Sequence, residues 1–145
     1  MKLIIDTNVL FSFFKKDSTT RKIITLIDLF EFYTLKSRLD EVLKHKEEVC
    51  TKANITSEEF SKTLNEIKIF VNIVKDEEIK QYGKEAKKLA PHEEDIPCFA
   101  LALALNSSIW SNEEKFKNQD KIKIFSTSDL ISLLSKLDIE KFIIS

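Results

Sequence analysis

The chain has 145 residues, of which 43% are hydrophobic and 32% are charged, so its length and composition predict a single globular domain over residues 1–145. This composition excludes a disordered or fibrous protein, because enough apolar residues are present to build a core. The 23 basic and 24 acidic residues leave a formal net charge of −1, and no overall positive field attracts a polyanion. Any contact with nucleic acid must therefore come from a local patch.

Glycine occurs once, at Gly83, and this count excludes several chemistries. Phosphate-binding loops, dinucleotide fingerprints, nucleophile elbows and the glycine-bearing RNA motifs all need two or more glycines at fixed spacing. The two cysteines, Cys50 and Cys98, lack the spacing of a zinc site and are too few for a disulfide framework. The apolar opening, residues 1–5, is too short for a signal peptide, and no apolar run approaches the ~20 residues of a membrane span. We expect a cytoplasmic protein without membrane contact.

Short β-branched runs alternate along the chain with longer segments of helical period. In chain order, the pattern predicts a strand at 3–5, helices at 6–14 and 19–30, a strand at 32–35, helices at 37–46 and 56–69, a strand at 71–74, helices at 77–89 and 95–105, strands at 108–110 and 122–125, and a helix at 126–134. Strands separated by helices indicate a mostly parallel sheet covered on both faces, which is an α/β fold.

Several helix boundaries carry capping signals. Ser37 is expected to cap the helix at 37–46, and Thr56 with Glu59 forms a capping box for the next helix. The helix at 126–134 begins with a similar pair, Ser126 and Asp129. The helix at 95–105 is apolar on nearly all sides, so it should be buried.

Four acids from separate segments are expected at one edge of this sheet. Asp6 ends the first strand, Glu41 lies on the helix after the second strand, and Asp95 opens the helix that leads to the fourth strand, which Glu113 follows. Ligands of open parallel sheets gather beyond the carboxyl ends of the strands. Two carboxylates 4 Å apart repel each other by about 4 kcal/mol at an effective dielectric constant of 20, and Mg²⁺ or Mn²⁺ would offset such repulsion.

Each of these acids also has a purely structural interpretation. Asp6 is a good N-cap for the first helix, and Asp95 suits a helix N-terminus through the helix dipole. Glu41 fits a solvated helix face, and Glu113 fits an ordinary polar loop. Only their joint arrangement favours a metal site.

Four stretches of the chain, in order, resemble the PIN-domain family of VapC-like metal-dependent ribonucleases. They are residues 4–10 (IIDTNVL), 39–46 (LDEVLKHK), 94–103 (EDIPCFALAL) and 109–113 (IWSNE), and the resemblance spans residues 3–116. It implies a three-layer α/β/α fold with a five-stranded sheet of order 3-2-1-4-5. Many prokaryotic members of the family are toxins paired with an antitoxin.

The resemblance also implies the site. Carried over residue by residue, the catalytic, metal-holding acids are Asp6, Glu41, Asp95 and Glu113, around Mg²⁺ or Mn²⁺. Ser111 and Asn112 lie beside them as substrate-binding candidates. Lys115 is a further candidate from the residues themselves: it belongs to a group of lysines after the acids that can either follow phosphates or form a solvated loop, namely Lys115, Lys117, Lys121 and Lys123. The family more often has aspartate where this chain has Glu113, and the extra methylene moves the carboxylate by ~1.5 Å at most.

The mechanism that follows is hydrolysis of a phosphodiester bond, with a metal-activated water and a second metal at the leaving oxygen. RNA as substrate is implied by the resemblance, whereas the spacing of the acids fits DNA equally well. Two alternatives stay open: a PIN-like module that binds RNA or protein without cutting, and a toxin held inactive by an antitoxin. A homodimer is expected from the apolar stretches 30–35 and 142–144 and from the frequency of dimers in the family.

Overall fold

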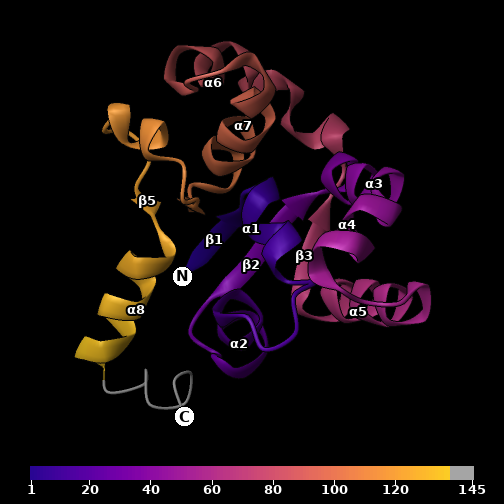
Figure 1. The fold of residues 1–145 in the computed structure, drawn as a ribbon. Coiled ribbons are helices and arrows are strands. Elements are labelled where there is room, and N and C mark those ends of the chain that lie inside the picture. The colour runs from indigo at the N-terminus through magenta and orange to yellow at the C-terminus, as the bar shows by residue number, and fades with distance from the viewer. Residues whose placement is uncertain (138–145) are drawn as a thin grey trace.

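The structure is a computed structural model that describes residues 1–137. Its sheet has five parallel strands in the order β3-β2-β1-β4-β5, as expected. Figure 1 labels four of them, β1, β2, β3 and β5. The strands are β1 (Lys2–Ile5), β2 (Glu31–Leu35), β3 (Val71–Val74), β4 (Ser108–Trp110) and β5 (Ile124–Phe125). The helices are α1 (Thr7–Ser12), α2 (Thr19–Leu26), α3 (Lys36–Lys44), α4 (Lys46–Ala53), α5 (Ser57–Phe70), α6 (Gly83–Leu89), α7 (Ile96–Leu105) and α8 (Thr127–Lys136). Short 3₁₀ helices cover Asp76–Tyr82, Glu93–Asp95 and Glu114–Asn118.

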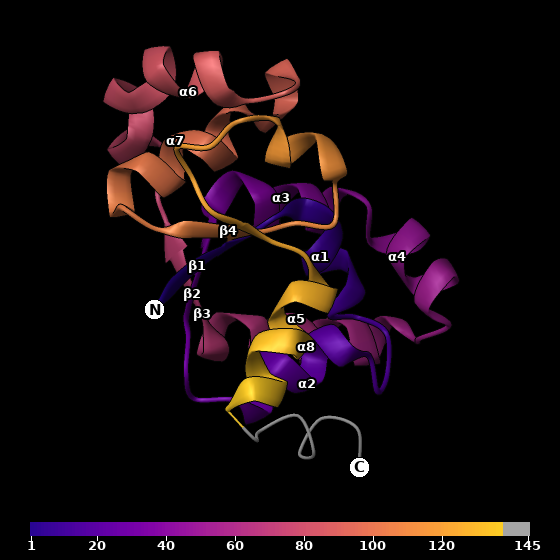
Figure 2. The same ribbon diagram turned by 90° about the vertical axis from the view of Figure 1, so that its left-hand side faces the viewer.

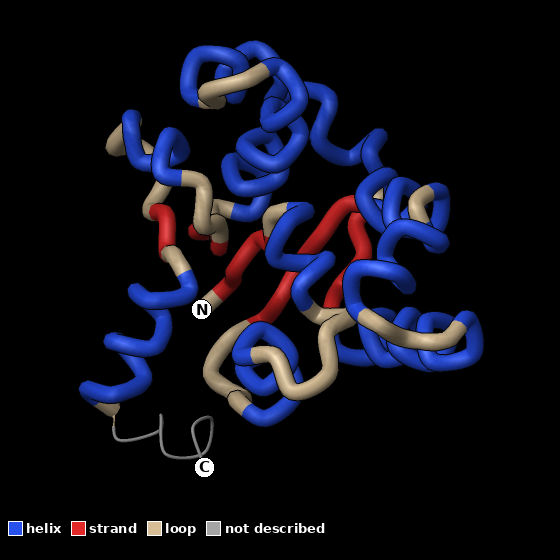
Figure 3. Tube along the Cα trace, viewed as in Figure 1, coloured by secondary structure: helices blue, strands red, loops and turns tan. Residues whose placement is uncertain are grey.

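Helices cover both faces of the sheet, so the fold has three layers. Figure 2 shows α6 and α7 above the strands and α2, α5 and α8 below them. Alternation along β1 sets the two faces, because Leu3 and Ile5 enter one buried cluster while Ile4 enters the other. The strands are short and lie inside the molecule, between helices on either side (Figure 3).

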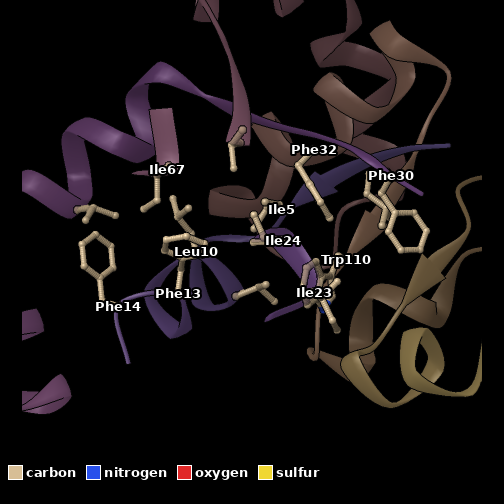
Figure 4. Packing of buried hydrophobic residues seen from close by; sticks show 14 of the residues in the cluster. Ile5, Leu10, Phe13, Phe14, Ile23, Ile24, Phe30, Phe32, Ile67 and Trp110 are labelled. Atoms are coloured by element: carbon tan, nitrogen blue, oxygen red, sulfur yellow. The ribbon is translucent and has the colours of Figure 1, made fainter. Parts of the chain in front are cut away.

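The larger cluster joins the sheet to the lower layer of helices. Phe13 and Ile67 are fully buried there (Figure 4). The rings of Phe14 and Phe60 stack with their centroids 4.8 Å apart. Trp110 of β4 is also fully buried, and its indole N–H donates to Thr127 Oγ1 at 3.0 Å. This packing fixes the carboxyl ends of β1 and β4, and two of the candidate acids, Asp6 and Glu113, follow these ends.

Asparagine takes the place that glycine often has at helix ends. Asn54 after α4 and Asn106 after α7 have φ of 54° and 48°, in the left-handed region. Asparagine tolerates this region better than most residues, which lets a chain with one glycine end these helices. Gly83 itself is helical, with φ of −60°.

Several predicted boundaries are wrong. Ser37 does not cap a helix: α3 begins at Lys36 without a side-chain cap, and both the N–H and the hydroxyl of Ser37 donate to the carboxylate of Asp76. The predicted helix 37–46 ends at Lys44, and a separate helix, α4, follows it.

Three other segments are shorter or divided. The predicted helix 77–89 is a 3₁₀ helix followed by α6, the helix at 19–30 ends at Leu26, and the strand at 122–125 covers Ile124–Phe125 only. Ile27 and Phe30 are nevertheless buried, since the chain continues across the core after the helix ends.

The surface argument for a homodimer is also partly wrong. Residues 30–35 form β2 and the residue before it, and β2 lies between β1 and β3. Phe32 is 3% exposed and Leu35 is 1% exposed, so apart from the partly buried Tyr33 this stretch offers little apolar surface to a partner. The other stretch, 142–144, lies outside the described residues. The dimer itself stays a prediction.

Candidate functional site

The four predicted acids, Asp6, Glu41, Asp95 and Glu113, line one cavity of about 240 Å³. They reach it from different elements: the residue after β1, the middle of α3, the 3₁₀ helix before α7, and the loop after β4. The carboxyl ends of β1 and β4 are adjacent in the sheet, which places the cavity where ligands of parallel sheets bind.

Asp6 is held from two sides. Its backbone N–H donates to Trp110 O at 3.0 Å, which continues the pairing of β1 with β4. Its Oδ1 accepts the N–H of Thr7 at 2.8 Å as the N-cap of α1, and its Oδ2 accepts the hydroxyl of Ser111 at 2.8 Å. Asp6 is therefore both a helix cap and a member of the acidic cavity, so the two interpretations of this residue are compatible.

Ser111 connects two of the acids. Its hydroxyl donates to Asp6 and accepts the backbone N–H of Glu113 at 3.1 Å. The side chain of Ser111 is 1% exposed, so it positions these acids from behind the cavity.

Burial and neighbouring charge raise the pKa values of two carboxyls. For Asp6, loss of hydration raises the pKa first, hydrogen bonds from Ser111 and Thr7 oppose the rise, and Glu113 adds to it. For Asp95, loss of hydration is again the largest cause of the raised pKa, followed by the charges of Asp6 and Glu94. Carboxyls whose pKa values are raised inside a concave site are typical of functional sites.

Arg38 was not predicted from the sequence, and it also lines the cavity. Its Nη1 lies 3.2 Å from Oε2 of Glu41, one turn along α3, and its Nη2 donates to the backbone carbonyl of Glu94 at 2.6 Å. Its positive charge opposes the rise in the pKa of both Asp6 and Asp95. The three-residue spacing of Arg38 and Glu41 indicated an ion pair, but not that the pair faces the other acids.

The donor set fits Mg²⁺ or Mn²⁺ in kind, because it consists of carboxylate oxygens whose mutual repulsion a divalent cation relieves. Their placement is looser than a ligand shell. Within residues 1–137, no group of three or more His, Cys, Asp or Glu side chains is close enough to hold a metal ion. Glu41 is turned toward Arg38 instead, and the long side chains of Glu41 and Glu113 would have to adjust to share one ion.

The substrate-binding candidates lie outside the cavity lining. Both ends of the Asn112 amide are hydrogen-bonded to Thr127: the Nδ2 of Asn112 donates to Thr127 Oγ1 at 3.1 Å, and its Oδ1 accepts the N–H of Thr127 at 2.8 Å. Lys115 is exposed on the 3₁₀ helix that follows the site. Two other lysines of that group have acidic partners, Lys117 with Asp129 at 2.7 Å and Lys121 with Glu85.

A second pocket of about 360 Å³ adjoins the acidic cavity and shares three of its lining residues, Asn8, Phe11 and Glu41. Lys15 and His45 are among its other lining residues. The two hollows together extend from the sheet edge across α1 toward α4. This shape suits a substrate longer than one phosphate group.

The protein has a three-layer α/β/α fold. Its parallel sheet of order 3-2-1-4-5 lies between helical layers, and an acidic cavity lies beyond the carboxyl edge of the sheet. A family model, PIN domain, matches residues 4–127, and the chain belongs to the PIN-domain family. No curated protein matches the chain. No helix within residues 1–137 has the length and apolar character that crossing a membrane requires.

Two solved structures show the same fold. One is VapBC2 from Rickettsia felis bound to a DNA fragment from its promoter, with a TM-score of 0.66 and 16% identity over 87% of this chain and 98% of the matched chain. The other is VapBC-1 from nontypeable Haemophilus influenzae, with a TM-score of 0.63 and 17% identity over 88% of this chain and 99% of the matched chain. These structures confirm the predicted α/β/α fold, and the family model over residues 4–127 confirms the predicted family.

Proposed function

We propose that this PIN domain is a metal-dependent endoribonuclease that hydrolyses RNA phosphodiester bonds in its acidic cavity. The observation that carries the proposal is the convergence of Asp6, Glu41, Asp95 and Glu113 from four segments on one cavity at the carboxyl edge of the sheet. No glycine-based phosphate loop exists in this chain, so chemistry on a phosphate depends on side chains.

The four acids would hold Mg²⁺ or Mn²⁺. When bound, such a cation polarises a phosphoryl oxygen and lowers the pKa of a water molecule. Asp6 is the fixed member, because Ser111 and Thr7 orient its two oxygens. The carboxylates hold and orient, and none of them needs to become a covalent nucleophile. The adjoining pocket beside Phe11 would accommodate a nucleotide next to the cleaved bond.

The test is cleavage of labelled single-stranded RNA by the purified protein in Mg²⁺, in Mn²⁺ and in EDTA. Cleavage should require the metal, and Asp95→Asn should reduce it by about 100-fold or more, since even the partners of metal ligands contribute about 10–100-fold. Two neighbours on α3 give a matched pair: Glu41→Gln should lose activity, whereas Asp40→Asn should keep it, because Asp40 pairs with Lys36 on the surface. Equal activity of these two variants would contradict the role of Glu41.

A binding module without catalysis is the second candidate, and the lack of a gathered ligand shell within residues 1–137 favours it. Such a module would bind the labelled RNA or a protein partner and leave the RNA intact at every metal concentration. The same cleavage assay therefore separates the two functions.

We further propose that the protein acts in the cytoplasm as the toxin of a toxin–antitoxin pair and forms a homodimer. The named structural neighbours are VapBC complexes, which supports an antitoxin partner for this chain. Co-expression with the product of the adjacent gene, followed by purification and light scattering, tests both the partner and the dimer. A monomeric mass at tens of micromolar protein would contradict the dimer.

A further inference from the structure

Arg38 places one guanidinium among the carboxylates of the cavity. Its side chain is 21% exposed, and its two contacts within the described residues go to the Glu41 carboxylate and to the carbonyl of Glu94. A guanidinium has five N–H donors, so these two contacts leave three of its donors for other partners. The Glu41 contact is a single hydrogen bond and not the two-pronged pairing that arginine makes with its strongest carboxylate partners.

Charge accounts for the position of Arg38. The lining of the cavity contains Glu94 in addition to the four predicted acids, and Arg38 is its only arginine or lysine among the described residues. A guanidinium beside desolvated carboxylates relieves their repulsion, which agrees with its effect on the pKa of Asp6 and Asp95. Arg38 thus provides, in part, the positive charge that a divalent cation would supply.

We propose that Arg38 is the phosphate-binding residue of this site and that Glu41 holds it until a divalent cation takes Glu41. The proposal rests on the proposed function. A divalent cation held by the Glu41 carboxylate would neutralise the charge that attracts Arg38 and repel the guanidinium, so it would weaken their single hydrogen bond and loosen the guanidinium. The freed guanidinium then binds a phosphate of the RNA, whose planar oxygen pairs fit its donors.

This arrangement couples the two ligands. Metal binding at Glu41 frees Arg38 for RNA, and RNA on Arg38 frees Glu41 for metal, so each ligand strengthens the other by the same factor. A structural role for Arg38 differs in its consequences. If Arg38 served only to tether the turn at Glu94, its loss would loosen Asp95 and weaken metal binding.

The first measurement is Mn²⁺ affinity by calorimetry, without RNA. Arg38→Met removes the competing charge and keeps the length of the side chain, so it should bind Mn²⁺ more tightly, by up to about tenfold, the scale of removing one unit charge from beside a divalent cation in water-like surroundings. Arg38→Lys keeps the charge and should stay within about twofold of the unaltered protein. Lys36→Met is the matched control, because Lys36 pairs with Asp40 on the outer face of the same helix. If Arg38→Met binds Mn²⁺ no more tightly than Lys36→Met, the competition is refuted.

The second measurement is the affinity of a labelled single-stranded RNA by fluorescence anisotropy in Ca²⁺. Both Arg38→Met and Arg38→Lys should lose about tenfold or more, because neither retains the planar fork that binds phosphate. RNA affinity of Arg38→Lys equal to that of the unaltered protein would refute the phosphate role. Mn²⁺ binding without RNA cleavage in the unaltered protein overturns the proposed function and leaves both measurements on Arg38 interpretable. No Mn²⁺ binding at all overturns both proposals.

Discussion

Replacing Asp6 by asparagine separates its role in the cavity from its role as a helix cap. Asparagine caps a helix about as well as aspartate, so the bond from Thr7 N–H to Oδ1 is kept. The hydroxyl of Ser111 loses its carboxylate acceptor, which costs about 1 kcal/mol. Against this cost, the variant loses a charge that burial and Glu113 disfavour. The metal-free variant should therefore be as stable as the unaltered protein, or more stable, at neutral pH.

The direction in which stability changes with pH follows from the raised pKa of Asp6. The pKa of Asp6 is raised above its ordinary 3.8, so the folded state binds this proton more tightly than the unfolded state. The protein consequently loses stability as the pH rises from about 3.8 through the raised folded value. Asparagine does not ionise, so the stability of Asp6→Asn relative to the unaltered protein should increase over this window and stay higher at pH 7. Urea unfolding at pH 3, 5 and 7, followed by the fluorescence of Trp110, measures this difference.

The stabilisation of the folded protein by bound Mn²⁺ is a larger signal than the effect of Asp6→Asn on the metal-free protein. A ligand that binds only the folded state stabilises it by RT ln(1 + [L]/Kd), which is about 2.7 kcal/mol at 100 times Kd. With about 4 °C of Tm per kcal/mol for a chain of this length, Mn²⁺ should raise the Tm of the unaltered protein by about 10 °C. If Asp6→Asn weakens binding about 100-fold, the same Mn²⁺ stabilises by only about 0.4 kcal/mol, or about 2 °C.

The matched control is Asp76→Asn. Asp76 accepts one backbone N–H and one hydroxyl, both from Ser37 at 3.0 and 2.6 Å, so its loss of hydrogen bonding resembles that of Asp6. It does not line the cavity, and its variant should keep the full Mn²⁺ shift. An unchanged Mn²⁺ shift in Asp6→Asn, or equal shifts in both variants, would refute the assignment of Asp6 as a metal ligand.

Three further changes test the support of Asp6, a surface ion pair and the core. Ser111→Ala should cost about 1–3 kcal/mol in urea unfolding and move the acid limb of the pH–activity profile upward, because the Ser111 hydroxyl lowers the pKa of Asp6; an unmoved limb would contradict this. The Lys117 ammonium is the main cause that holds the pKa of Asp129 at about 2, so the small stability that this pair adds is present above about pH 4 and is lost as the pH falls toward 2. In urea unfolding, the stability of Asp129→Asn should not show this decrease between about pH 4 and pH 2. Ile67→Ala should cost about 2–5 kcal/mol, and a measured loss below 1 kcal/mol would show that the core relaxes around it.

The parallel sheet and the convergence of the acids were predictable because both follow from local patterns. Alternating apolar runs locate strands, and in a parallel sheet the residues after neighbouring strands meet at one edge. Asp6 and Glu113 needed no more information than their place after β1 and β4. The family resemblance supplied the order of the strands.

Contacts between distant segments were not predictable in this way. Ser37 was predicted to cap a helix, but its hydroxyl donates a hydrogen bond to Asp76, 39 residues further along the chain. Asn112 resembled a substrate-binding residue, but Thr127 satisfies both ends of its amide. No local pattern marks Arg38 as a site residue; its contact with Glu94, 56 residues away, joins it to the cavity, which both residues line. Polar side chains have many possible partners, and only the folded chain determines which partner is within reach.

The cavity combines a rigid acid with adjustable ones, and this difference has a chemical consequence. Asp6 follows the buried residue Ile5, and three hydrogen bonds, to Trp110, Thr7 and Ser111, fix its backbone and both carboxylate oxygens. Glu41 has a longer side chain that is 42% exposed and has an arginine as its partner. A cation entering the cavity would therefore find Asp6 already in place and would gain Glu41 by moving it. Moving Glu41 away from Arg38 costs free energy, and this cost lowers the affinity of the site for the ion. The charge of Arg38 on α3 therefore influences whether Glu41 joins the other acids around the ion.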